Sequence, residues 1–198
     1  MGATKQKKIR KYDSTSRLEK SRASRRRILE TLARLTVQKR GGEVHIDEIA
    51  KASGISERSI YRFFKDKKAL HDEMESYVLT FVQKNFERLA ELNVDGFARA
   101  SFATFDENAE MTEAYVLSPM GQEARLAFRR KLKRALIDRI LKSRKINGNH
   151  ENQKKLAFIV TLVNASLWYD IKRDFGYNGV DMGDTVAWAI KTLIADLC

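Results

Sequence analysis

Apolar residues recur every three or four positions through most of this chain, and that spacing most restricts what it can fold into. Burying one face of an α-helix produces such a repeat, whereas a strand needs strict alternation, which no segment shows. A single proline, Pro119, interrupts the 198 residues, which fits long uninterrupted helices. Hydrophobic residues make up 43% of the chain, enough for a sizeable core. We therefore predict an all-α protein of about nine helices.

Positive charge is concentrated near the N-terminal end. The net charge is +12, and residues 1–40 hold 14 Lys and Arg against 3 Asp and Glu, while residues 73–198 are nearly balanced. A near-neutral body with a basic end indicates a polyanionic partner, usually nucleic acid; the alternative is a solvated tail that keeps the protein soluble. Residues 1–20 are predicted to form a flexible basic arm.

Residues 46–70 carry the strongest functional signal. A helix with Ile46 and Ile49 facing inward ends near Gly54, and Ser56 then caps a further helix of about seven residues. A helix that short is not stable alone, so its neighbours must hold it and leave its polar face outward. Because a helix fits the major groove, where its N-terminal side chains reach base edges, the pattern predicts a DNA-reading helix-turn-helix.

This segment resembles the DNA-binding domain of the TetR (tetracycline-repressor) family of bacterial regulators, over about residues 24–72. Spacing and residue type agree together at Ile28, Leu35, Gly41, Ile49, Ala50, Gly54, Ile55, Ser56, Tyr61, Phe64, Lys67 and Leu70. The resemblance implies an N-terminal three-helix helix-turn-helix DNA-binding domain, assigned to residues 21–72. It also implies a C-terminal helical domain over residues 73–198 that serves dimerisation and is a candidate ligand-binding domain.

Ten side chains are candidate DNA contacts. Arg58 replaces the small residue usual in the family and can bond guanine O6 and N7 with two parallel donors. The resemblance implies that Tyr61 and Lys67 contact phosphates. Ser56 has either a DNA contact or a capping role alone, and Arg62 is either groove-facing or solvated. The set is His45, Ser56, Glu57, Arg58, Ser59, Tyr61, Arg62, Lys67, Arg22 and Arg26.

Two further positions depart from the family pattern. His45 stands where a small hydroxyl residue is usual, and Phe63 stands where the family has His. Both departures change the phosphate contacts that the pattern implies. Phe63 and Phe64 are predicted to be core residues rather than stacking platforms.

The C-terminal part offers a candidate ligand pocket, although ordinary core packing explains each of its aromatic residues singly. The predicted lining residues are Phe102, Phe105, Tyr115, Phe128, Trp168 and Tyr169. Residues 125–145 form a second basic segment, with 10 Lys and Arg against Asp138. That segment is an anion-binding site, a second DNA contact, or simply the solvated face of an amphipathic helix.

Two apolar stripes on the last two predicted helices, about 151–174 and 184–198, form the candidate dimer interface. Paired across a two-fold axis they would make a four-helix bundle; the alternative is that they pack inside the protomer. The stripes consist of Leu156, Ile159, Val163, Leu167, Val186, Ile190, Leu193 and Leu197.

Other classes of protein receive little support. The three histidines lie far apart, neighbouring residues in His71-Asp72-Glu73 point in different directions, and no phosphate-binding glycine loop or nucleophile elbow is present. Cys198 has no partner for an internal disulfide, and no apolar run approaches a membrane span. We expect a non-enzymatic protein of the bacterial cytoplasm, associated with the nucleoid, without metal or cofactor.

These observations predict a sequence-specific transcriptional regulator, a repressor released from a palindromic operator by a small-molecule ligand. Its expected partners are double-stranded DNA, a second copy of the chain and an effector of unknown identity, and not a membrane. The alternative is a non-specific, nucleoid-type DNA-binding protein without an effector.

Overall fold

The computed structural model describes residues 14–89, 92–118 and 122–197, which form ten α-helices and no strand. In chain order the helices are α1 (Ser14–Gln38), α2 (Ile46–Ser53), α3 (Glu57–Phe63), α4 (Lys67–Leu89), α5 (Val94–Glu107), α6 (Ala109–Leu117), α7 (Gln122–Arg144), α8 (His150–Thr161), α9 (Ala165–Phe175) and α10 (Gly179–Ala195). The predicted all-α fold is confirmed, with one helix more than expected among the described residues.

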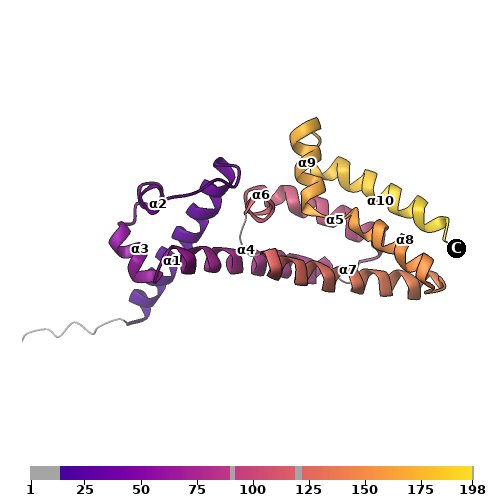
Figure 1. Ribbon diagram of the computed structural model, residues 1–198, viewed down its shortest axis with the longest axis horizontal. Helices are drawn as coiled ribbons and strands as arrows, with labels where there is room; N and C mark the ends of the chain where they lie inside the picture. Colours follow the sequence, from indigo (N-terminus) through magenta and orange to yellow (C-terminus); the bar gives the residue numbers. More distant parts are fainter. Residues whose placement is uncertain (1–13, 90–91, 119–121, 198) are drawn as a thin grey trace, which may run out of the picture.

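The molecule is elongated, and α4 runs from one end toward the other (Figure 1). Helices α1 to α3 gather at one end, and α5, α8 and α10 lie at the other. At the N-terminal end the apolar core contains Ile28, Leu32, Ile49, Ile60 and Leu70, which are almost wholly inaccessible to solvent. Ile60 is the one fully buried residue of α3, with Phe63 partly buried against the same core, so neighbouring helices fix the position of this short helix.

The two ends share a packed boundary at the last turn of α6, which contacts α1 and α4. Gly41, with φ of +82°, lies so close that a Cβ there would stand 2.6 Å from the carbonyl oxygen of Leu117. On α4 the buried carboxylate of Glu75 accepts a hydrogen bond from the Ser118 hydroxyl. Arg125 of α7, also buried, donates to the Ser118 carbonyl at 2.7 Å. A shift of α6 would therefore also displace α1 and α4, which pack against it.

The predicted helix over residues 151–174 is wrong as one element, because it is two helices. α8 ends at Thr161 and α9 begins at Ala165. Asn164 adopts an extended conformation, and its side chain accepts a hydrogen bond from the Leu167 N–H at 2.8 Å. That bond satisfies a free donor of the first turn, so an asparagine restarts the helix without glycine or proline.

The final helix begins at Gly179 rather than near residue 184. A Cβ at Gly179 would lie 2.2 Å from the carbonyl oxygen of Phe102, and one at Gly183 would lie 3.0 Å from the Cα of Arg99. These glycines therefore let α10 approach α5 closely; they do not break the helix. Asn178 caps it by accepting from the Asp181 N–H.

Two other predicted boundaries shift. Residues 14–20, assigned to the basic arm, are the first turns of α1, since Arg, Lys and Leu are good helix formers. Residues 1–13 of the predicted arm lie outside the described residues, as does Pro119 of the predicted helix start at Ser118-Pro119. The described part of that helix begins at Gln122.

Candidate nucleic-acid interface and cavity

A glycine turn and a serine cap present α3 at the surface. Gly54 ends α2 in the left-handed conformation, φ +68°, and its N–H donates to the Ala50 carbonyl. The Ser56 hydroxyl accepts from the Ser59 N–H at 3.3 Å and donates to Ser59 Oγ at 3.0 Å. The predicted capping by Ser56 is confirmed, while DNA contact by Ser56 and Ser59 stays a prediction.

The outward face of α3 carries Glu57, Arg58, Tyr61 and Arg62, all exposed; half of the Tyr61 surface is accessible. Arg58 makes no hydrogen bond or ion pair with any residue that the structure describes. The Arg62 guanidinium lies 5.5 Å from the centre of the Phe63 ring. Of the predicted contacts, these four project together from a helix whose opposite side is held in the core.

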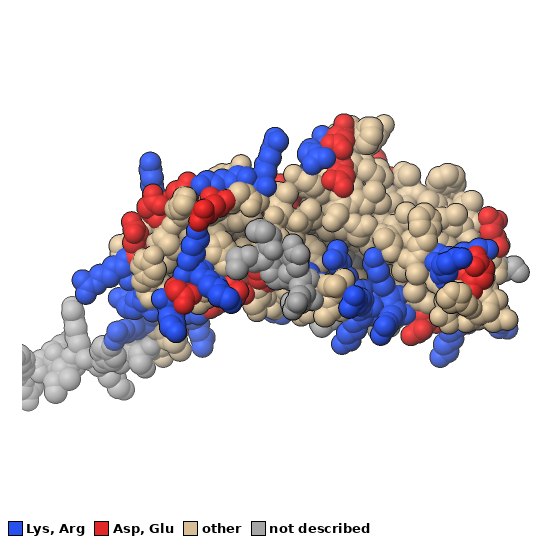
Figure 2. All heavy atoms as spheres, in the orientation of Figure 1, with Lys and Arg blue, Asp and Glu red and all other residues tan. Residues whose placement is uncertain are grey.

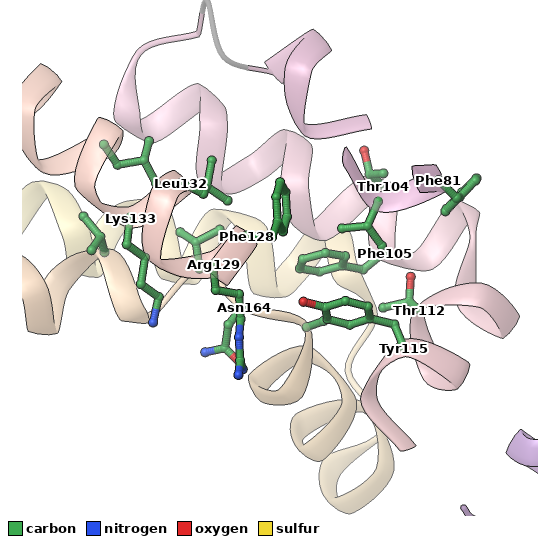
Figure 3. A pocket seen from close by; sticks show the side chains of 15 residues that line it. Phe81, Thr104, Phe105, Thr112, Tyr115, Phe128, Arg129, Leu132, Lys133 and Asn164 are labelled. Carbon is green, nitrogen blue, oxygen red and sulfur yellow. The ribbon is translucent and has the colours of Figure 1, made fainter. Parts of the chain in front are cut away.

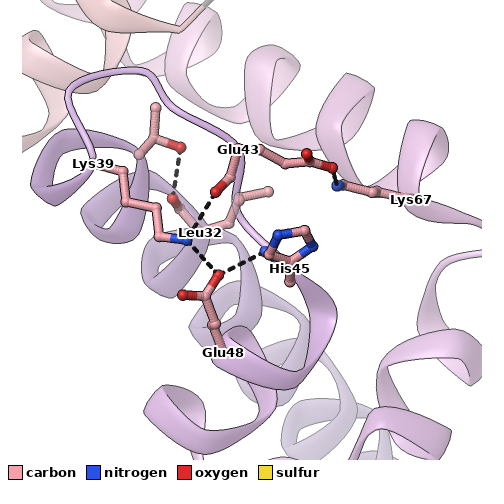
Figure 4. A network of polar contacts seen from close by, with 7 residues as sticks. Leu32, Lys39, Glu43, His45, Glu48 and Lys67 are labelled. Carbon is pink, nitrogen blue, oxygen red and sulfur yellow. Dashed lines mark hydrogen bonds and ion pairs between the residues drawn. The ribbon is translucent and has the colours of Figure 1, made fainter.

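A polar network ties the loop after α1 to the start of α2 and α4 (Figure 4). Lys39 Nζ donates to the Glu43 carbonyl at 2.8 Å and to Glu48 Oε2 at 2.6 Å. Glu48 also accepts from the His45 backbone N–H at 2.9 Å, and His45 is exposed at the N-cap of α2. Lys67 Nζ donates to Glu43 Oε1 at 2.5 Å, and this bond lowers the pKa of Glu43. Lys67 is thus engaged with a carboxylate before any phosphate approaches.

The arginines of α1 divide into structural and exposed groups. Arg25 pairs with Glu73 of α4, donates to the Phe63 carbonyl at 3.0 Å and lies 4.7 Å from the centre of the Phe64 ring. It therefore holds α1 against the end of α3. Arg26, a predicted DNA contact, is exposed and pairs with Glu30 at 2.7 Å.

Two cations that were assigned to the basic arm lie on α1 near α3. Arg17 and Lys20 of α1 line a surface hollow together with Arg62 of α3. Arg22, predicted as a DNA contact, is exposed on the same helix. Lys and Arg side chains project from this end of the molecule (Figure 2).

A second candidate site is a partly open cavity of about 50 Å³, lined by residues of α4, α5, α6 and α7 and of the junction of α8 with α9 (Figure 3). Phe105, Tyr115 and Phe128, three of the six residues proposed for a ligand pocket, line this cavity, and ligand binding there stays a prediction. Burial raises the pKa of the Tyr115 phenol.

The other three predicted pocket residues lie elsewhere. Phe102 and Trp168 are fully buried in the core between α5, α9 and α10, and Tyr169 is half-buried with the Arg173 guanidinium 5.4 Å from its ring centre. The cavity is also lined by two basic side chains of α7, Arg129 and Lys133, which belong to the second basic segment and were not predicted as pocket residues. Aromatic side chains alone could not show which of them share a cavity.

The predicted dimer residues are largely internal. Leu156, Ile159, Val163, Val186 and Ile190 are each at most 8% exposed. The remaining three are partly buried against the same core: Leu167, Leu193 and Leu197. The choice of stripe was therefore wrong as an outward face, because the apolar spacing of α8 and α10 serves packing inside the protomer.

Different apolar residues of these helices are exposed. Phe158 of α8 and Trp188 of α10 are 63% and 66% exposed, and Val180 at the start of α10 is 62% exposed. Nothing in their residue types distinguished them from the core stripes.

No helix in the described ranges is both long and apolar enough to cross a membrane. Among the same residues, no three His, Cys, Asp or Glu side chains form a group that could hold a metal ion.

The fold and the exposed α3 define a helix-turn-helix protein with an attached helical domain. Residues 28–74 match the family model described as bacterial regulatory proteins, tetR family. Residues 28–74 are thus similar to the DNA-binding domain of the TetR family, in agreement with the resemblance seen in the sequence.

Solved structures show that the likeness in fold extends over most of the chain. The TetR-family transcriptional regulator PfmR from Thermus thermophilus superposes with a TM-score of 0.65 at 17% identity, covering 82% of this chain and 96% of that one. A putative transcriptional regulator from Streptomyces coelicolor, SCO4942, gives 0.61 at 16%, covering 86% and 97%. The dihydroxyacetone kinase operon activator DhaS gives 0.52 at 13%, covering 88% and 97%. A comparison with curated proteins found no match.

Proposed function

We propose that this protein is a sequence-specific, DNA-binding transcriptional regulator acting in the bacterial cytoplasm. The observation that carries the proposal is the exposed face of α3, with Arg58, Tyr61 and Arg62 directed away from a helix anchored by Ile60 and Phe64. Such a helix can enter the major groove, where Arg58 reads base edges while Tyr61 and cations of α1 contact phosphates.

We propose that the active form is a two-fold dimer, so that two copies of α3 read a palindromic operator. Half-sites would lie about 34–36 Å apart, one turn of the duplex. Phe158 of α8 and Trp188 and Val180 of α10 support a second copy as the occupant of these helices' outer surface, because each is more than 60% exposed and large exposed apolar side chains often mark contact surfaces. The match of residues 28–74 to the tetR family model supports the same arrangement.

The cavity supports regulation by a ligand. Thr112 and Tyr115 of α6 line it, and the end of the same helix contacts the N-terminal side of the molecule, because Leu117 lies against Gly41 and the C-cap Ser118 bonds Glu75 of α4. A ligand larger than the present cavity would displace α6 and thereby change the spacing of the two recognition helices. We propose that this release of DNA relieves repression. The structural likeness to a protein named as an operon activator makes activation the competing direction.

Selection of bound duplexes from a random pool tests the proposal. A regulator should enrich one palindromic sequence and bind it at least about a thousandfold more tightly than a scrambled duplex of the same length. Equal binding to both would instead support a non-specific, nucleoid-type protein, which the basic N-terminal region favours. Footprinting of the enriched duplex, with a protected length of two half-sites, would check the dimer.

A further inference from the structure

Two cations stand at one end of the cavity. Arg129 and Lys133 occupy successive turns of α7 and both line it. Figure 3 shows them on the same side of the cavity as Asn164, which lies at the junction of α8 and α9. The Asn164 carboxamide is committed to structure, since it accepts from the Leu167 N–H and donates to the Thr161 carbonyl at 2.7 Å. At this end of the cavity, Arg129 and Lys133 are therefore the side chains that could bind an ion.

These cations lack a counter-charge in the part of the chain that the structure describes. No Asp or Glu is among the described residues that line the cavity, and neither cation forms an ion pair with a described residue. Lys133 donates one hydrogen bond, to Thr161 Oγ1 at 2.9 Å, and an ammonium group has three donors. Burial and then the nearby Arg129 charge lower the pKa of Lys133. An anion placed between the two would relieve both effects.

The remainder of the cavity is apolar. The rings of Phe128, Phe105 and Tyr115 follow the basic end, and the opposite wall carries Phe81 (Figure 3). Aliphatic side chains complete the lining: Val82, Leu132, Leu136, Val160 and Val163. An occupant must therefore offer an apolar body to the rings and a polar group to α7.

We infer that the cavity binds a small amphipathic anion, an apolar body carrying one carboxylate or comparable acidic group held by Arg129 and Lys133. A guanidinium and an ammonium both favour carboxylate partners, and charge-assisted bonds in a partly desolvated site are the stronger kind. Binding of such an anion follows from the lining of the cavity alone. Its role as an effector rests on the proposed function.

The test uses three probes that share one chain length: octanoate, octanol and octylamine. Each is titrated calorimetrically into the full chain at neutral pH, without DNA and below the concentration at which the probe aggregates. Octanoate should bind about tenfold to a hundredfold more tightly than octanol, since hydrogen bonds to a charged group separate them, and octylamine should bind most weakly.

Lys133→Met keeps the apolar stem and removes the charge, so the preference for octanoate over octanol should fall by about tenfold. Lys131→Met removes an exposed charge of the same helix that does not line the cavity, and should keep the wild-type preference. Thermal unfolding shows whether each variant is folded. If Lys133→Met does not fold, Arg129→Gln replaces it, because Arg129 also lines the cavity but is exposed, and it too should lower the preference for octanoate.

Equal affinity for octanoate and octanol, an unchanged preference in Lys133→Met, or no binding of octanoate would each overturn the inference. Because no DNA is present, absence of an operator in the selection experiment leaves this result standing. Conversely, a failed titration leaves the proposed DNA binding intact.

Discussion

At the scale of single residues, two cations of the N-terminal domain differ in what they contact in free protein. Arg58 is exposed and forms no ion pair among the described residues, whereas Lys67 is bound to Glu43. A base-reading side chain can remain solvated until it enters the groove. A lysine held by a carboxylate must exchange that partner for phosphate, so its contribution to affinity is reduced by the bond it gives up.

Substitution of Arg58 by Ala should weaken binding to the selected duplex by about 1–3 kcal/mol and relax preference at one base position per half-site. Repeating the duplex selection with the variant measures both effects. Lys142→Ala, which removes an exposed charge of α7, is the matched control and should leave the selected sequence unchanged. An unaltered selected sequence with Arg58→Ala would show that α3 is not docked as proposed.

Glu43→Gln should strengthen DNA binding a few-fold, for operator and scrambled duplexes alike, because it frees Lys67 for phosphate. One additional phosphate contact should steepen the slope of log affinity against log salt by about 0.9. Fluorescence anisotropy over a salt series measures the affinity and the slope. Asp47→Asn removes a nearby exposed acid that has no ion pair within the described residues, and should change the slope less. Equal effects of the two variants would mean that Lys67 makes no phosphate contact.

At the scale of helices, one asparagine begins each of several elements of the C-terminal domain. Asn93, Asn149, Asn164 and Asn178 accept hydrogen bonds from N–H groups three residues onward, at 2.7 to 2.9 Å. Each bond satisfies a donor that the first turn leaves free. The end of α5 adds a second device, because the Asp106 carboxylate accepts from Trp168 Nε1 at 2.9 Å and from the N–H of Gly179.

Asp106 connects three helices, and its loss should destabilise them together. Burial opposes ionisation of Asp106, but bonds from Gly179, Trp168 and Lys172 outweigh it and lower the pKa. A lowered pKa adds stability above the unfolded value of about 4 and loses it as pH falls through the folded value. Asp106→Asn should therefore lower the free energy of unfolding by about 1–3 kcal/mol at neutral pH and less in acid.

Urea unfolding at neutral pH and at about pH 3 measures this difference. Glu107→Gln changes the adjacent exposed acid and should have a small effect at both pH values. A loss of stability in Asp106→Asn that does not depend on pH would contradict the assigned ionisation.

At the scale of the whole molecule, the exposed faces of α8 and α10 hold the proposed dimer together. Trp188→Glu should raise the dimer dissociation constant at least about thirtyfold, because interface aromatics commonly contribute about 2 kcal/mol or more. Sedimentation velocity at micromolar protein reports the change. Leu126→Glu, at another exposed apolar position on α7, should leave the association unchanged. A wild-type chain that is monomeric at that concentration and still binds its duplex would rule out the dimer.

Sequence reasoning reached the fold and the position of α3 because local signals specify them: apolar spacing, the Gly54 turn and the Ser56 cap. The prediction from sequence failed where one residue pattern is compatible with two different structural roles. The stripe through Leu156 and Ile190 has the same spacing whether it meets its own protomer or another. Gly179 looked like a break because glycine frees the backbone, yet its role is close approach to α5. Asn164, a cap residue, was the available signal for the missed break.

The contact of Gly41 with Leu117 has a consequence for how such proteins can be recombined. The family match ends at residue 74, yet α1 and its loop fit against α6, and Glu75 bonds Ser118 just beyond that point. A chimaera joined there would place the loop of another protein against the carbonyl oxygen of Leu117, where a side chain at the position of Gly41 would not fit. The DNA-binding domain of this chain should therefore be transferred together with α6. We expect substitutions in the loop at Gly41 and in the last turn of α6 to be correlated among related sequences.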